Sequence, residues 1–141
     1  MKNKLGLFCF FASLMLFIPV SCSKAPGKEA QRYVWVTGLK PEKADYYREL
    51  HANAWPGVSR MIAECNIVNF SIHEFEIDGK LYLVAYLEYV GDDFAADMAK
   101  MGEDPETQRW WKETDPCQLP LPEAAEAGKI WSDTKEVFFQ E

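Results

Sequence analysis

The chain has 141 residues, with 22 acidic and 15 basic side chains and a net charge of −7. This acidic balance excludes nucleic acid as an expected partner, because phosphate binding requires clustered Lys and Arg. The two histidines, His51 and His73, have no CxxC or HExxH companion, so the sequence predicts no metal site.

Residues 1–21 have the layout of a secretory signal, in which two lysines precede an uncharged run shorter than a membrane span. Ser21 before Cys22 resembles the cleavage site of bacterial lipoproteins. We therefore expect Cys22 to carry lipid and to anchor the protein in the cell envelope, in the periplasm or at the outer membrane. An ordinary signal peptide cut nearby is the alternative. The segment 22–31 is expected to be a tether, and 32–141 one domain.

Apolar residues alternate over 32–39, which predicts a first strand. A helical segment follows from Pro41, and Pro56 is expected to break or restart it after Trp55. Asp78-Gly79 marks a hairpin turn between two further strands. The remaining expected elements are strands over 67–77 and 80–90, two short helices within 91–115, a Pro-rich loop over 116–128 and a last strand over 129–141. Asp104-Pro105 is expected to open the second of the two short helices.

This order of strand, helix, strand, strand, helix, strand matches the βαββαβ pattern of a ferredoxin-like α+β domain. The antiparallel sheet of such a domain carries helices on one face only. Val34, Val36, Leu83 and Ala85 are apolar strand residues that would need cover on the other face. A second copy of the sheet would supply that cover, so we expect a homodimer that forms a dimeric α+β barrel.

Two further cysteines, Cys65 and Cys117, remain if Cys22 carries lipid. An oxidising compartment would allow them to form a disulfide. Pairing also requires that their Cα atoms lie close together, and the sequence does not give that separation. Both a disulfide and two free thiols stay open.

Tyr47, His51 and Trp55 are spaced four residues apart, which on a helix places them on one face. The imidazole is the only side chain whose unperturbed pKa allows it to donate and accept protons near neutrality. His51 is therefore the best single candidate for acid–base chemistry. Packing of these three rings in the core is the alternative interpretation.

Trp110 and Trp111 stand side by side in a charged setting. Consecutive helical residues point about 100° apart, so both rings cannot enter one narrow core stripe. Aromatic faces stack on the apolar C–H faces of sugars, and the indole N–H donates a hydrogen bond. We expect one ring to wall a pocket while its neighbour fixes the first.

These residues fall in segments that resemble the L-rhamnose mutarotase family, in the same order and with similar spacing. The resemblance spans nearly all of 32–140 and implies ferredoxin-like subunits that form a dimeric α+β barrel. It also implies interconversion of the α and β anomers of L-rhamnose, or a related deoxy sugar, without a cofactor. The matching segments are "YYRELHANAWP" (46–56), "NFSIHEF" (69–75), "QRWWKETD" (108–115) and "KEVFF" (135–139).

The resemblance implies a role for each residue of the site. His51 is then the catalytic proton donor, Tyr47 a sugar-binding hydroxyl, and Trp110 and Trp111 the wall of the sugar site. Phe70 stands where the family has a substrate-binding Tyr, so an aromatic ring is kept and a hydroxyl is lost. The familiar enzymes of the family are cytoplasmic, whereas the leader of this chain predicts the cell envelope.

Mutarotation removes a proton from the anomeric hydroxyl and protonates the ring oxygen, so it requires acid–base groups tuned close to neutrality. The second proton carrier is Tyr47, a carboxylate or a water. Two other functions remain: a non-catalytic sugar-binding lipoprotein, and a haem-degrading or cofactor-free monooxygenase on the same dimeric fold. His73 is expected to have a surface or packing role and not a catalytic one, because it points away from the strand face that Phe70 and Ile72 share.

Overall fold

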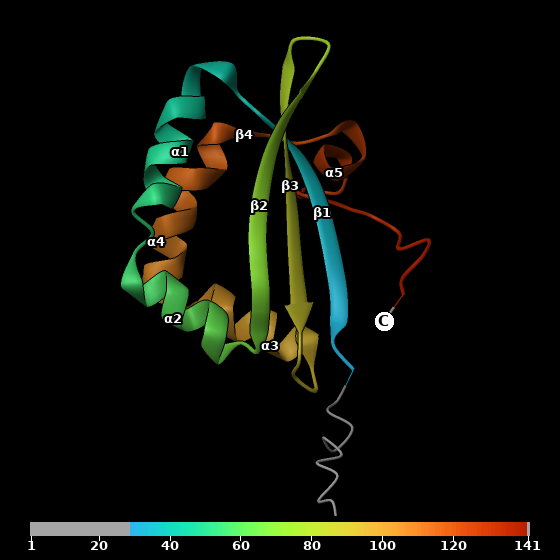
Figure 1. Cartoon of the computed structure of the whole chain (residues 1–141). Coiled ribbons are helices and arrows are strands. Elements are labelled where there is room, and N and C mark those ends of the chain that lie inside the picture. The colour runs from blue at the N-terminus through green and yellow to red at the C-terminus, as the bar shows by residue number, and fades with distance from the viewer. Residues whose placement is uncertain (1–28, 141) are drawn as a thin grey trace, which may run out of the picture.

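The computed structural model describes residues 29–140 as an antiparallel sheet with helices α1 to α4 on one side (Figure 1). The strand order is β2-β3-β1-β4, with β5 also beside β1, so the predicted ferredoxin-like α+β class is confirmed. The strands are β1 (Gln31–Leu39), β2 (Ile67–Ile77), β3 (Lys80–Tyr89), β4 (Gln118–Leu119) and β5 (Ser132–Asp133). The helices are α1 (Ala44–Ala52), α2 (Pro56–Glu64), α3 (Phe94–Glu103), α4 (Pro105–Thr114) and α5 (Pro122–Glu126), with 3-10 turns η1 (Pro41–Lys43) and η2 (Asp115–Cys117).

The helices begin at residues that suit a first turn. Pro56 opens α2 and Pro105 opens α4, as the sequence predicts, because the fixed φ of proline fits that position. The Asp104 carboxylate accepts a hydrogen bond from the Thr107 N–H at 2.7 Å, which satisfies one of the free N–H groups of α4.

The break between α1 and α2 comes earlier than expected. Helix α1 ends at Ala52, and Trp55 precedes α2 as its cap residue. Tyr47 and His51 therefore share a helix face, whereas the prediction that Trp55 continues that face is wrong. The extended backbone that a residue before proline prefers explains why Trp55 cannot remain helical before Pro56.

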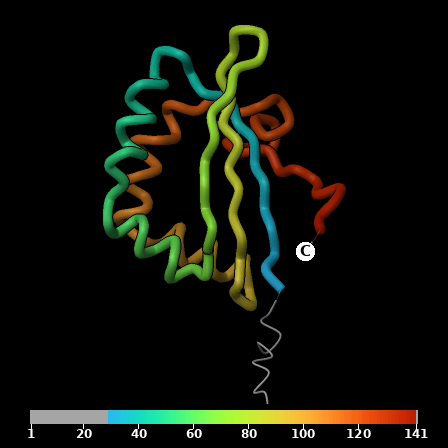
Figure 2. Tube along the Cα trace, in the orientation of Figure 1, coloured from blue at the N-terminus to red at the C-terminus, as the bar shows by residue number. Residues whose placement is uncertain are grey.

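The β2–β3 hairpin projects beyond the helices at one end of the molecule (Figure 2). Its turn residues Asp78 and Gly79 have φ of 51° and 73°, the left-handed region that a tight hairpin turn requires, so this prediction is confirmed. Further along β2, the register with β3 shifts between Val68 and Ser71, and Asn69 has a φ of 50°. This bulge lies directly beside Phe70.

The predicted last strand over 129–141 is wrong in most of its length. The fourth strand position is taken by β4, inside the segment expected to be a Pro-rich loop, and only β5 of the later segment pairs with β1. Pro120 and Pro122 lack an N–H, which limits β4 to two residues. The segment 134–140 is extended and runs on the β1 side of the sheet, away from helices α1 to α4, with Phe138 78% exposed (Figure 1).

The apolar strand residues divide between two faces of the sheet. Val36 pairs with Val84, so Val34 and Val36 lie on the outer face, where both are half-buried. Leu83 and Ala85 lie on the opposite face and are buried under the helices. The expectation that all four need a second sheet is therefore wrong for Leu83 and Ala85, because successive strand residues alternate between faces.

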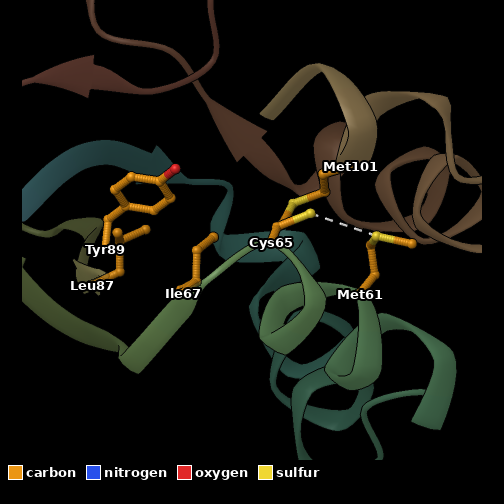
Figure 3. Close-up of a cluster of buried hydrophobic side chains, with 6 residues drawn as sticks. All are labelled: Met61, Cys65, Ile67, Leu87, Tyr89 and Met101. Carbon is orange, nitrogen blue, oxygen red and sulfur yellow. Dashed lines mark hydrogen bonds between the residues drawn. The ribbon is translucent and has the colours of Figure 1, made fainter. Parts of the chain in front are cut away.

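Two clusters of buried side chains hold the helices to the sheet. Cys65 lies in the first, where its thiol is 3.6 Å from the Met61 sulfur, and Cys117 lies in the second. Both are free thiols, so the disulfide left open by the sequence is absent. Figure 3 shows the first cluster, made of Met61, Cys65, Ile67, Leu87, Tyr89 and Met101. The second contains Leu39, Ala44, Tyr47, Leu83 and Cys117.

Candidate active site

A cavity of about 290 Å³ lies between the sheet and helices α1, α2 and α4, and members of both buried clusters line it. Its volume is at the lower end of the range for small-molecule sites. A second hollow of about 500 Å³ shares several lining residues with it and extends along α1 and β2. The structure brings all five predicted site residues to the first cavity: Tyr47, His51, Phe70, Trp110 and Trp111.

The position of one proton on His51 follows from its hydrogen bond. His51 Nδ1 lies 2.9 Å from the carbonyl oxygen of Tyr47, one turn earlier on α1. A carbonyl only accepts, so Nδ1 carries the hydrogen and Nε2 of the neutral ring has a free lone pair. Burial lowers the pKa of His51, and the bond to the carbonyl only partly offsets this. The neutral ring is therefore favoured near pH 7, with Nε2 available as a base.

Aromatic rings hold the imidazole in place. The Tyr47 ring lies 4.1 Å from the His51 ring, and Trp110 meets His51 edge-on at 5.2 Å. Trp55, although outside α1, meets Trp110 edge-on at 5.4 Å. Offset and edge-on contacts of this kind stabilise a fixed ring geometry. Tyr47, His51 and Trp55 therefore lie in one cluster. Tertiary packing against Trp110, and not a shared helix face, brings Trp55 to it.

The two tryptophans occupy different environments on α4. Trp110 is 6% exposed, whereas Trp111 is 38% exposed, as expected for consecutive helical residues. Both line the cavity. Trp110 makes its ring contacts with His51 and Trp55, so it both fills the core and walls the cavity.

Tyr47 is buried and lines the cavity. Burial raises the pKa of its hydroxyl to about 12, although the nearby Gln118 side chain lowers it. The Tyr47 hydroxyl therefore keeps its proton and acts as a donor. Gln118 and Asp115 also line the cavity, and the sequence did not single them out. Asp115 ends the "QRWWKETD" segment, which was a signal that could have found it.

Phe70 and His73 both belong to β2 but face opposite ways. Phe70, beside the bulge, lines both hollows and is half-exposed. His73 pairs with Val84 on the outer face and is exposed, with Nε2 3.2 Å from the Ser71 hydroxyl. Of the two roles expected for His73, surface or packing, its exposed side chain agrees with the first.

The geometry defines a class of protein. A neutral histidine with a fixed tautomer, a protonated phenol and aromatic walls line a cavity suited to a small polar ring, on a ferredoxin-like α+β domain. This is an acid–base enzyme site. Comparison with known proteins identifies which enzymes share it.

The model of the L-rhamnose mutarotase family matches residues 32–140, and the chain belongs to that family. The L-rhamnose mutarotase of Shouchella clausii is 28% identical over 109 residues, which cover 77% of this chain and 96% of the relative. That of Bacillus subtilis is 28% identical over 98 residues, which cover 70% and 86%. The protein is thus an isomerase that acts on the anomers of a sugar, and the sugar-binding lipoprotein and the monooxygenase are set aside.

Solved structures agree on the fold. The crystal structure of an L-rhamnose mutarotase from Formosa agariphila superposes with a TM-score of 0.59 at 20% identity, covering 79% of this chain and 99% of that one. Tetracenomycin F2 cyclase from Streptomyces glaucescens superposes with a TM-score of 0.54 at 14% identity, covering 79% and 100%. A cyclase and a mutarotase on one fold illustrate that the residues of the site, and not the fold, decide the reaction.

The predicted location in the cell envelope is corrected by these matches. It rested on residues 1–21 and on Cys22, which lie outside the described residues. The family match starts at residue 32, and the matched relatives are named L-rhamnose mutarotase, a family whose familiar members are not envelope proteins. Membership in the family therefore overturns the predicted envelope location, and the family match lends no support to a lipid anchor on Cys22. Within residues 29–140, no helix has the length and apolar character to cross a membrane.

Proposed function

We propose that this protein interconverts the α and β anomers of L-rhamnose or a closely related deoxy sugar, with His51 as its principal proton carrier. The observation that carries the proposal is the fixed tautomer of His51, which offers Nε2 to a ligand in a cavity walled by aromatic rings. The names of the relatives support L-rhamnose as the sugar. Trp110, Trp111 and Phe70 give the cavity apolar walls that suit the methyl group and C–H faces of a deoxy sugar.

The proposed reaction balances two proton transfers. His51 Nε2 accepts the proton of the anomeric hydroxyl while the bond between the anomeric carbon and the ring oxygen breaks. The ring oxygen takes a proton from a second group, which leaves an open-chain aldehyde. Rotation of the aldehyde and closure on its other face reverse both transfers, so His51 returns the proton and the enzyme ends unchanged.

Asp115 is our candidate for the second group. Its half-buried carboxyl lines the cavity, and within residues 29–140 it has no hydrogen-bond or salt-bridge partner. Burial raises its pKa, which favours the protonated form that a proton donor needs. Burial raises the pKa of the Tyr47 hydroxyl to about 12, so this group holds its proton firmly near pH 7. Asp115→Asn should therefore slow anomer exchange and leave sugar affinity unchanged, and normal exchange in this variant would exclude the carboxyl.

Saturation-transfer NMR on an equilibrated sugar tests the function directly. Saturation of the α-anomer signal of L-rhamnose should pass to the β-anomer signal when the wild-type protein is added. A panel of other deoxy sugars under the same conditions identifies the preferred substrate. Line broadening that reports binding, without transfer between anomers of any sugar in the panel, would contradict the proposal.

We further propose that two copies associate through the outer face of the sheet. The half-buried side chains of Val34, Val36 and Val84 on that face support this, as does the exposed Phe138 beside β1. Sedimentation equilibrium should give a dimer for the wild type and a monomer for Val36→Glu. Glu42→Lys is the control that should stay dimeric, because Glu42 is an exposed residue of the η1 turn. A monomeric wild type would overturn this assignment.

A further inference from the structure

Three buried side-chain atoms have no hydrogen-bond partner in the described part of the chain: Thr107 Oγ1, Gln118 Oε1 and Ser132 Oγ. Native proteins leave few buried polar atoms unpaired, so each requires a reason. Ser132, on β5, is not among the residues that line the cavity. Thr107 does line it, but its side chain lies close enough to Asp104 to help lower the pKa of that carboxyl. Gln118 lines the cavity, and within the described residues nothing donates a hydrogen bond to its Oε1.

The backbone fixes Gln118 firmly. Its side chain is buried, and the residue is 4% exposed. Strand β4 places it opposite Leu39 of β1, and the next pair is Gly38 with Leu119. A Cβ at Gly38 would stand 2.7 Å from the Leu119 carbonyl oxygen, so glycine is what permits this close approach. The sheet therefore fixes the backbone of Gln118, and burial of the side chain restricts the position of its unpaired Oε1.

The two ends of the Gln118 amide have different surroundings. The Gln118 side chain lies close enough to the Tyr47 hydroxyl to lower the pKa of Tyr47, which is the effect expected when the amide N–H faces the phenol oxygen. Tyr47 thereby accepts through its oxygen and keeps its own proton free to donate. The oxygen end of Gln118 is left buried, and leaving such an acceptor unpaired destabilises the folded protein. A ligand that brings a neutral donor into the cavity would remove that cost.

We propose that Gln118 is a substrate-binding residue whose Oε1 accepts a hydrogen bond from one hydroxyl of the bound sugar. Its nitrogen holds the Tyr47 hydroxyl so that Tyr47 donates to the neighbouring sugar oxygen. Because Gln118 and Tyr47 are neighbours in the cavity wall, the two sugar oxygens they contact are adjacent on the ring. Gln118 thus helps to determine which sugar is accepted, since an analogue without the hydroxyl leaves Oε1 unpaired again. This inference rests on the proposed function, which makes the ligand a sugar.

The experiment is a binding titration of L-rhamnose and its monodeoxy derivatives against wild type, Gln118→Met and Ser132→Ala. Met keeps the length of the side chain and removes both polar ends. Gln118→Met should bind L-rhamnose about three- to tenfold more weakly, the usual effect of one lost hydrogen bond to a neutral hydroxyl. That loss should disappear for the one monodeoxy sugar that lacks the contacted hydroxyl. Ser132→Ala removes an unpaired buried hydroxyl outside the cavity and should match wild type with every sugar.

Two results would overturn the assignment: equal loss of affinity for every sugar in the panel, or no loss at all. If Gln118→Met does not fold, Gln118→Glu replaces it, because Glu keeps the shape and an acceptor oxygen. Gln118→Glu should still prefer L-rhamnose over the critical deoxy sugar, and equal affinities would reject the contact. The readout is binding, so absence of anomer exchange in the wild type would count against the proposed function and not against this contact.

Discussion

Two polar groups that line the cavity differ from polar groups on the outer face of the sheet. On the outer face, Arg32 donates to Glu136 at 2.8 Å, and Tyr86 donates to Glu88 at 2.7 Å. On the helix side, among residues 29–140, the carboxyl of Asp115 and the amide oxygen of Gln118 have no partner. The paired groups are partly exposed, whereas the unpaired groups line a cavity.

We infer from this contrast that the unpaired groups of the cavity are the functional ones. A surface group that pairs with a neighbour contributes little to stability and needs nothing further. A polar group that lines a cavity without a partner lowers the stability of the folded protein until a ligand pairs with it. The following predictions test that division by changing matched residues on the two faces.

The largest effect is expected for the two histidines. His51→Gln should reduce anomer exchange by about 10²- to 10⁴-fold, because it removes the proton carrier and keeps a side chain of similar size. His73→Gln, on the outer face, should exchange like wild type. Saturation-transfer NMR and circular dichroism measure activity and folding in parallel. Near-normal exchange in folded His51→Gln would remove His51 from the mechanism.

The tryptophans should differ mainly in stability. Trp110→Ala removes a buried ring packed on His51 and Trp55 and should lower the free energy of unfolding by about 3–5 kcal/mol. Trp111→Ala, at a partly exposed position, should cost less than about 1 kcal/mol and weaken sugar binding instead. Urea denaturation and sugar titration measure the two effects. Equal destabilisation by both changes would mean that the pair acts as one core unit.

A smaller effect is expected on β2, where aromatic residues occur on both faces. Phe70→Tyr should strengthen L-rhamnose binding up to roughly tenfold, because it restores a hydroxyl at a cavity position. Phe75→Tyr, where the ring stacks on Tyr82, is the control and should not change affinity. Phe70→Ala should weaken binding by removing the wall itself. If all three variants titrate like wild type, Phe70 does not contact the sugar.

The smallest effect is a shift in pH dependence. Because burial lowers the pKa of His51 below its ordinary value of 6.5, the neutral base should persist to a more acidic pH than an ordinary histidine allows. The acid limb of the exchange rate should therefore have its midpoint below pH 6.5. Because the pKa of His51 is lower in the folded protein, its contribution to the free energy of unfolding is fully present at pH values above its pKa in the unfolded chain. That contribution is lost as the pH falls through the lower pKa of the folded protein. A midpoint at or above 6.5 would show that His51 is not desolvated in solution.

Local patterns in the sequence account for most of the elements. Alternation predicted the first three strands, Asp78-Gly79 predicted the hairpin, and Pro56 and Pro105 predicted helix starts, because each depends on the backbone of a few neighbouring residues. The spacing of Tyr47 and His51 likewise predicted that they lie one turn apart on α1. The resemblance to a known family then assigned roles that spacing alone left open.

Tertiary structure decided what depends on residues distant in the sequence. Gly38 pairs with Leu119, and that contact selects β4 as the fourth strand and places Gln118 in the cavity. Nothing near Gln118 in the sequence encodes this pairing, because the close approach depends on a glycine in the first strand. The sequence by itself predicted most of the elements and the histidine that we propose as the proton carrier. The register between β1 and β4 decided which further polar groups meet it, since only folding brings the two ends of the domain together.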